Sequence, residues 1–230
     1  MPYLLDWIAL SVFFALWGGY TLYANRAGKR RNSLSSVMHH FRIGWMARLL
    51  SRQNRVADMS AVSNLERNSA FFASSSLFVV AGLLTVLAAS DQVMAMLNNL
   101  ALLQAGSRTL LEIKIGLMIA IYVFAFLGFT WSMRQYGFVS VLLGAAYTPD
   151  ETPTEAERRQ FVEKSALVMD LAARQFNYGL RAFYFSLAAL SWLVGPWALI
   201  ISSIAIVLVL YRREFHSGTL HALVAAKLPE

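Results

Sequence analysis

Residues 65–84 have the sequence LERNSAFFASSSLFVVAGLL, and this stretch decides the class of fold. Glu66 and Arg67 stand directly before a run without any charged residue, and two phenylalanines and three consecutive serines lie near the start of that run. About 20 consecutive apolar residues form a helix long enough to cross the hydrocarbon layer of a membrane. The stretch therefore predicts a transmembrane helix, which we place at residues 69–90.

The composition of the whole chain agrees with this interpretation. Of its 230 residues, 57% are hydrophobic and only 14% are charged, whereas a soluble domain carries about 25% charged residues. The formal net charge of +7 comes from basic residues that lie mostly between hydrophobic blocks, which is the pattern that orients a protein in a membrane. We therefore expect an all-α, polytopic membrane helical bundle with residues 1–230 in one domain, located in the cell (inner) membrane as a multi-pass protein. Its expected partner is the lipid bilayer and not nucleic acid.

Three further hydrophobic blocks lie at residues 3–24, 109–131 and 183–211, so the sequence predicts four transmembrane helices. The last block is too long for one upright span, and Gly195-Pro196 lies in its middle. Because proline removes a hydrogen bond from a helix and bends it, we expect one long helix, tilted and kinked at Gly195-Pro196. The alternative is a re-entrant hairpin, whose backbone would need shelter from lipid.

Lysine and arginine predict the orientation. Nine of the twenty lie in residues 25–68 and six in residues 132–182, which leaves five elsewhere. Positively charged loops stay in the cytoplasm, so four spans place both of these loops inside and both termini outside.

Both cytoplasmic loops carry helical signals. Residues 33–55 have apolar positions at helical spacing beside several arginines, which predicts an amphipathic helix that either lies on the anionic membrane surface or packs under the bundle. In residues 132–182, Thr152 can cap a helix that has Pro153 first and Glu155 completing a capping box. Asp170 and Arg174 have the spacing of an i, i+4 ion pair.

Charged residues near the outer ends of the predicted spans form a candidate polar or ion-pair site. Glu112 can reach Arg108 four residues earlier, whereas Lys114 points away from Glu112 on a helix. Lys114 therefore needs another partner, and Asp6 lies at the same level, so we expect an Asp6–Lys114 ion pair between helices. Snorkelling to the headgroups and an entry site for an ion or proton are the alternatives.

At the inner end of the second span, Glu66, Arg67 and Asn68 form an expected interface anchor. The free N–H groups of a helix N-terminus need acceptors, which Glu66, Asn68 and Ser69 supply, and Arg67 reaches the lipid phosphates.

The sequence offers no constellation for catalysis. It has no cysteine, and its four histidines lie outside the predicted spans. The adjacent His39 and His40 would point in different directions on a helix, and we find no hydrolase, phosphate-loop or metalloprotease signature. We therefore expect no enzyme activity, no metal and no cofactor. Ser74, Ser75 and Ser76 favour a helix-packing face over a pore lining, since small hydroxyl side chains let helices approach closely.

Several motifs together resemble a known membrane family, filed as domain of unknown function 599. They are ERNSAFFASSSLF, HHFRIGW, Glu112-Ile113-Lys114, FTWSMRQY, GLRAFYFSLAALSWLVGPW and YRREF, and the resemblance covers about residues 17–215. It implies an integral membrane protein and supplies no catalytic residues.

Two functions remain open at this point. The first is a non-enzymatic membrane component that forms a homo-oligomer or binds a membrane-protein partner. The second is a small ion or solute channel or transporter formed by an oligomer, which the charged residues at one level and the Gly195-Pro196 break favour.

Overall fold

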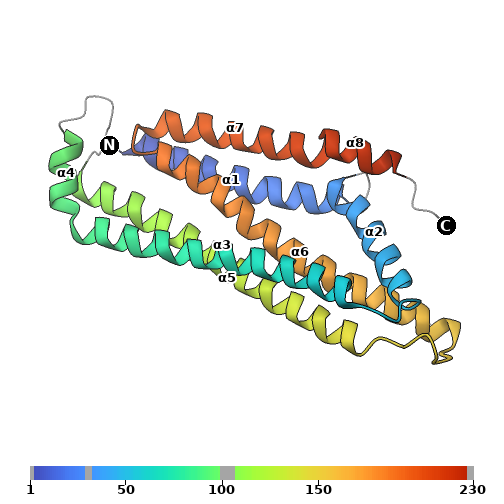
Figure 1. The fold of residues 1–230 in the computed structure, drawn as a ribbon. Helices are drawn as coiled ribbons and strands as arrows, with labels where there is room; N and C mark the ends of the chain where they lie inside the picture. Colours follow the sequence, from blue (N-terminus) through green and yellow to red (C-terminus); the bar gives the residue numbers. More distant parts are fainter. Residues whose placement is uncertain (1–2, 29–32, 99–106, 227–230) are drawn as a thin grey trace.

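The computed structural model describes residues 3–28, 33–98 and 107–226, and within these ranges it is all helical. Figure 1 shows the arrangement of the helices. They are α1 (Leu4–Ala27), α2 (Leu34–Leu49), α3 (Val56–Ala88), α4 (Ser90–Asn98), α5 (Arg108–Gly144), α6 (Glu155–Ser191), α7 (Pro196–Phe215) and α8 (Gly218–Ala225).

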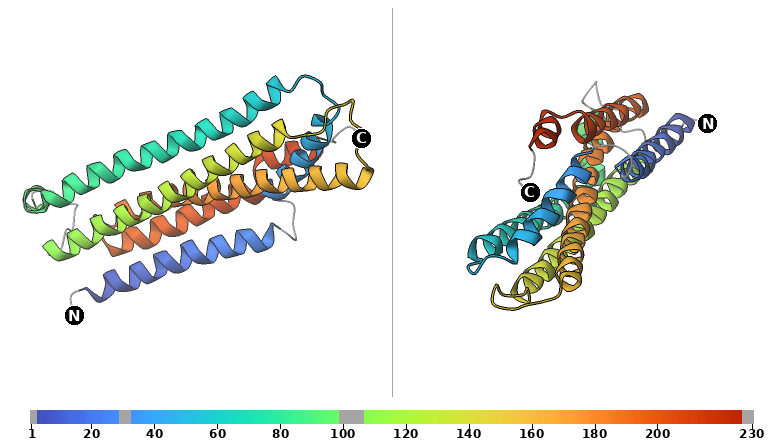
Figure 2. Two further views of the ribbon diagram at one scale, coloured as in Figure 1. Left: turned by 90° about the horizontal axis from the view of Figure 1, so that it is seen from below. Right: turned by 90° about the vertical axis from the view of Figure 1, so that its right-hand side faces the viewer.

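The five long helices α1, α3, α5, α6 and α7 run along one direction, with α4 at one end of the molecule and α2 at the other (Figures 1 and 2). We call these the α4 end and the α2 end. Helix α5 packs between α3 and α6, and α7 packs between α6 and α1. Helix α1 begins at the α4 end, whereas α8 lies at the α2 end.

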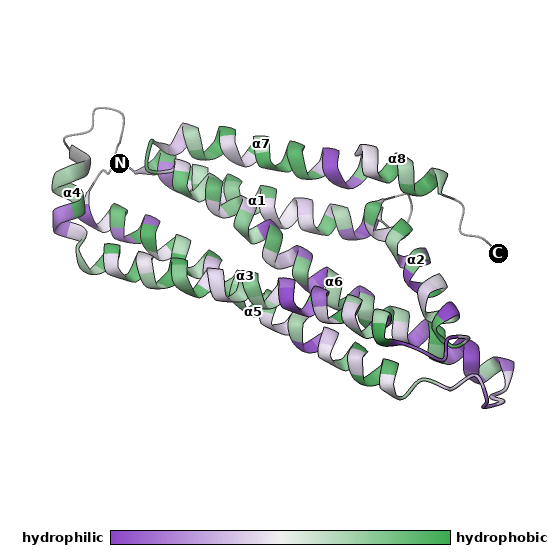
Figure 3. Cartoon of the chain, viewed as in Figure 1, coloured by the Kyte–Doolittle hydropathy of each residue, from purple (hydrophilic) through white to green (hydrophobic). Residues whose placement is uncertain are grey.

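Three helices are long and apolar enough to cross a membrane, namely α1, α3 and α5. They contain the predicted span 109–131, all but the first residue of 3–24 and all but the last two residues of 69–90. Helices α3 and α5 continue well beyond those spans towards the α2 end, where hydrophilic residues gather on α2 and on the first half of α6 (Figure 3).

The prediction of one kinked helix over residues 183–211 is wrong. Helix α6 ends at Ser191, and the N–H groups of the next three residues bond to carbonyls three residues earlier, at 3.0–3.1 Å. Gly195 then adopts a φ of 154°, which side chains rarely tolerate, and Pro196 occupies the first turn of α7, where its missing N–H costs nothing. The Gly-Pro pair therefore ends one helix and starts another.

The two helices are antiparallel neighbours. The hydroxyls of Ser191 and Ser202 lie 2.7 Å apart, and Arg213 donates to the hydroxyl of Tyr184, 29 residues earlier. In one continuous helix Tyr184 and Arg213 would be about 43 Å apart, since a helix rises by about 1.5 Å per residue. This additional reversal puts the start of α1 and helix α8 at opposite ends of the molecule (Figure 1). The expectation that both termini lie outside the cytoplasm stays a prediction.

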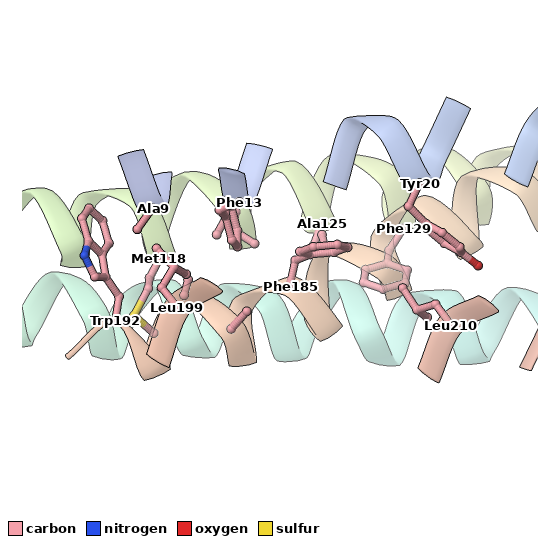
Figure 4. Packing of buried hydrophobic residues seen from close by; sticks show 14 of the residues in the cluster. Ala9, Phe13, Tyr20, Met118, Ala125, Phe129, Phe185, Trp192, Leu199 and Leu210 are labelled. Carbon is pink, nitrogen blue, oxygen red and sulfur yellow. The ribbon is translucent and has the colours of Figure 1, made fainter. Parts of the chain in front are cut away.

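Two hydrophobic clusters hold the helices together. The larger one lies mainly among α1, α5, α6 and α7, where the ring of Phe13 packs 5.6 Å from that of Phe185 (Figure 4). The ring of Trp17 stacks on Phe185 at 5.3 Å. The second one lies at the α2 end and joins Met46 of α2 to Val62 of α3, among others. Helix α2 thus packs under the bundle, which was one of the two alternatives for its apolar positions.

Helices α5 and α6 cross closely at two glycines. A Cβ on Gly179 would lie 2.7 Å from ring carbons of the fully buried Phe129, and one on Gly128 would lie 3.3 Å from the carbonyl oxygen of Gln175. Glycine at both positions lets the two backbones approach.

The start of α6 is shifted from its prediction. The N-cap is Thr154, not Thr152, and Glu157, not Glu155, completes the capping box. The carboxylate of Glu157 accepts from the backbone N–H and the hydroxyl of Thr154, both at 2.8 Å. These hydrogen bonds lower the pKa of Glu157.

Candidate functional site

Three helices meet at a buried polar cluster at the α4 end. Asp6 of α1 is 8% exposed and Lys114 of α5 is 2% exposed. Trp192, directly after α6, lies between them, because its indole N–H donates to the Asp6 carboxylate at 2.8 Å and its ring centroid is 5.4 Å from the Lys114 ammonium. The structure therefore brings the two predicted partners to one tryptophan, which is also a member of the larger hydrophobic cluster (Figure 4).

Arg108 and Glu112 form a separate, exposed group at the same end. The Arg108 Nε lies 2.8 Å from Glu112 Oε1, which is the predicted i, i+4 pair, and its Nη1 lies 2.8 Å from Asp91 of α4. Ser90 donates to Glu112 at 3.4 Å. The four residues predicted as one polar site thus fall into a buried pair and a surface pair.

The contacts of the buried pair can stabilise the fold. The indole N–H of Trp192 donates to the carboxylate, and the ammonium group lies over the indole ring. These contacts compensate buried charged groups and join α1 and α5 to the end of α6. Over the described ranges, no three His, Cys, Asp or Glu side chains are grouped so that they could hold a metal ion.

The interface anchor has a different place from the one predicted. Helix α3 begins at Val56, so Glu66, Arg67 and Asn68 lie three turns inside it, and their proposed role at a helix N-terminus is wrong. Residues 56–65, which precede this group, are also part of α3, and Val62 among them packs with residues of α5 and α6 in the second hydrophobic cluster. Arg67 lines a surface hollow of about 640 Å³ along the first turns of α3, together with Arg55, Val56, Met59, Ser60, Ser63 and Asn64.

Two serines near the start of the apolar run are buried inside the chain, and one of them, Ser69, joins an interhelical network that local spacing does not indicate. Ser69 and Ser76 are fully buried. The hydroxyl of Ser69 lies 3.2 Å from that of Ser132 on α5, which donates at 2.8 Å to the carbonyl oxygen of Ala172 on α6. Ser76 donates to the carbonyl oxygen of Phe72 in its own helix. By contrast, Ser74 and Gly82 face outward, and nothing lies within 4 Å of a Cβ built on Gly82.

The ion pairs of two carboxylates at the α2 end, the buried Asp58 and the part-buried Asp170, were also missed. Asp58 accepts from the indole N–H of Trp45 at 2.6 Å and pairs with Arg52. Asp170 pairs with His39 and, at 2.5 Å, with Arg42 of α2, and not with Arg174 as the spacing had predicted. A signal was present in the sequence, because a basic helix needs acidic partners if it packs against the bundle.

Comparison with known proteins supplies the family. Residues 8–219 match the model of a family described as a protein of unknown function, DUF599, and the chain belongs to that family, as its motifs indicated. No curated protein and no solved structure matches the chain.

Proposed function

We propose that the protein is a non-enzymatic component of the inner membrane that works as a homo-oligomer, with the outward face of α3 as the contact between copies. The observation that carries this proposal is the exposure of α3. Only 11% of the apolar 18-residue stretch of α3 is buried within the chain, whereas the corresponding fractions for the stretches of α1 and α5 are 22% and 39%. Helix α3 packs along α5 and on its outer side leaves Phe71 and Phe78 exposed.

Small residues on that face support contact with a second helix. Ser74 and Gly82 lie among the exposed positions, and small side chains let two backbones approach in a membrane, where packing and not the hydrophobic effect drives association. A second copy is the occupant we propose, since two copies of one such face form an isologous contact.

Two other serines of α3, Ser69 and Ser76, bear on the channel alternative. A pore through an oligomer would need Ser69 and Ser76 to face water, but both side chains are buried inside the chain and hydrogen-bonded there. Their placement supports the packing role over the conduit.

For the membrane arrangement we propose five crossings, made by α1, α3, α5, the second half of α6 and α7, with the α2 end in the cytoplasm. Fifteen of the twenty lysines and arginines belong to segments 25–68 and 132–182, which join helices at the α2 end, and Arg212 and Arg213 close α7 at that same end. Arg108 and Lys114 are the basic residues of the α4 end within the described ranges. This asymmetry follows the rule of positive loops inside.

Disulfide cross-linking tests the proposed contact. The chain has no cysteine, so Ser74→Cys introduces a single thiol, and oxidation of membranes should link two copies through it. Ile201→Cys is the matched control, because Ile201 is exposed to lipid at 65% on α7, away from α3. We expect covalent dimers from the first variant and not from the second, and a dimer mass in mild detergent. Equal cross-linking of both variants, or a dispersed monomer, would contradict the proposal.

A further inference from the structure

One face of α6 carries alternating tyrosine and arginine side chains. Tyr178, Arg181 and Tyr184 follow at intervals of three residues, which places them on adjoining turns of one face. The Arg181 guanidinium carbon lies 5.3 Å from the ring centroid of Tyr20 on α1 and 5.9 Å from that of Tyr178. The Arg213 guanidinium of α7 lies 5.4 Å from the ring of Tyr184 and donates to its hydroxyl.

Neither arginine has a carboxylate partner in the part of the chain that the structure describes. Arg181 is 9% exposed, and its buried Nη1 makes no hydrogen bond there. Glu214 follows Arg213 directly, but its Oε1 accepts from the backbone N–H and the hydroxyl of Ser35, at 3.1 and 2.7 Å. An aromatic face compensates a buried cation only in part, and an unmade hydrogen bond from a charged group is costly.

The arginines lie towards the α2 end of the larger cluster. Tyr20 occupies the opposite end of that cluster from Trp192 (Figure 4). Close by, Asn25 in the last turns of α1 donates to the hydroxyl of Tyr178 at 2.9 Å. In the proposed five-crossing arrangement this level adjoins the cytoplasmic leaflet.

We propose that Arg181 of α6, with Arg213 on the neighbouring helix α7, binds a phosphate group, carried by an anionic phospholipid of the cytoplasmic leaflet. A guanidinium matches the geometry of phosphate oxygens and forms paired, charge-assisted hydrogen bonds with them. The Arg181 guanidinium lies among tyrosine side chains of α1 and α6, and its buried Nη1 is a donor without an acceptor in the described part of the chain. The orientation of the site rests on the proposed arrangement in the membrane, but the site does not involve α3.

Thermal unfolding of the full chain in mild detergent tests this site. Phosphatidylglycerol should raise the melting temperature by several degrees, and phosphatidylcholine should not, because ligand binding stabilises the folded state. Arg181→Gln should lose most of that shift. The matched control is Arg174→Gln, which removes an exposed charge from the same helix and should keep the shift.

Two further measurements identify the source of the phosphate and keep the test valid if Arg181→Gln fails to fold. Inorganic phosphate that reproduces the Arg181-dependent shift would assign the site to free phosphate, whereas a response to phosphatidylglycerol alone assigns it to the lipid headgroup. Arg213→Gln, at the more exposed guanidinium, should reduce the shift even if Arg181→Gln fails to fold. A wild-type protein that responds equally to both lipids, or a folded Arg181→Gln that keeps the full shift, would overturn the proposal, whatever the cross-linking of α3 shows.

Discussion

The indole N–H of Trp192 donates a 2.8 Å hydrogen bond to the carboxylate of Asp6, which lies 186 residues earlier in the chain. The tryptophan is 1% exposed and also lies over the ammonium group of Lys114. One side chain at the turn between α6 and α7 thus connects the first helix to α5. This bond depends on the course of α6, which begins at the α2 end and brings Trp192 to the α4 end, next to the start of α1.

Removing the indole donor should loosen this connection. Trp192→Phe leaves the buried Asp6 carboxylate without its N–H donor, and a hydrogen bond to a charged group contributes about 1.5–3 kcal/mol. We expect a loss of that order in the unfolding free energy measured in detergent. Trp197→Phe is the control, because Trp197 is 64% exposed, and it should change the unfolding free energy little. Equal effects of the two substitutions would contradict the role of the bond.

The close crossing of α5 and α6 should tolerate no methyl group at Gly179. Its Cβ would lie 2.7 Å from the ring of the buried Phe129, so Gly179→Ala should cost about 1–3 kcal/mol through overpacking. Gly137→Ala is the matched control on α5, since nothing lies within 4 Å of its Cβ, and alanine forms helices better than glycine. Urea unfolding of both variants gives the comparison. Similar stability of the two variants would show that the helices are not in close contact.

The hydrophobic blocks could be predicted from the sequence, but the reversal could not. Bilayer thickness fixes the length of a span, so the apolar blocks within α1, α3 and α5 stand out. The full length of α6 is hidden in the sequence, because the first half of that helix is polar and amphipathic and the apolar block starts only at residue 183. Gly195-Pro196 is compatible with a kink and with a turn, and only the neighbouring helices decide between them.

The polar partners were less predictable for a related reason. Arg108 and Glu112 pair within one helix, so their spacing predicts the contact. Asp170 has a suitable neighbour at Arg174, yet it pairs with Arg42, 128 residues away, because α2 packs across α6. Local spacing carries no information about that packing.

The pairing of Asp170 should hold α2 in place. Asp170 and Arg42 are 13% and 17% exposed, and Asp170→Asn removes the charge that both Arg42 and His39 contact. We expect a loss of about 1–3 kcal/mol and faster amide hydrogen exchange in α2, since a partly buried arginine loses its ionic partner. Asp150→Asn, at an exposed position in the loop before α6, should leave that exchange unchanged. Unchanged protection of α2 in both variants would refute this role.

The capping box of α6 should make its first turn sensitive to acid. The hydrogen bonds from Thr154 hold the pKa of Glu157 below its ordinary value of 4.5. A lowered pKa adds stability that is fully present above pH 4.5 and is lost as the pH falls through the lower, folded-state value. The protection factors of the first-turn amides, which correct for the slower intrinsic exchange at low pH, should therefore fall on acidification more in the wild type than in Glu157→Gln. The same acid response in both proteins would rule out the carboxylate as its cause.

The most direct test of the account concerns the side of the membrane on which each end lies, since the α6–α7 reversal gives five crossings where a single kinked helix gives four. Tyr3→Cys and His221→Cys each add one thiol to a chain that has none, and an impermeant maleimide reports which side the thiol faces. We predict that in intact cells the reagent labels Tyr3→Cys, and that it labels His221→Cys only after the membrane is permeabilised. Labelling of both thiols in intact cells would contradict the reversal and the five crossings that depend on it.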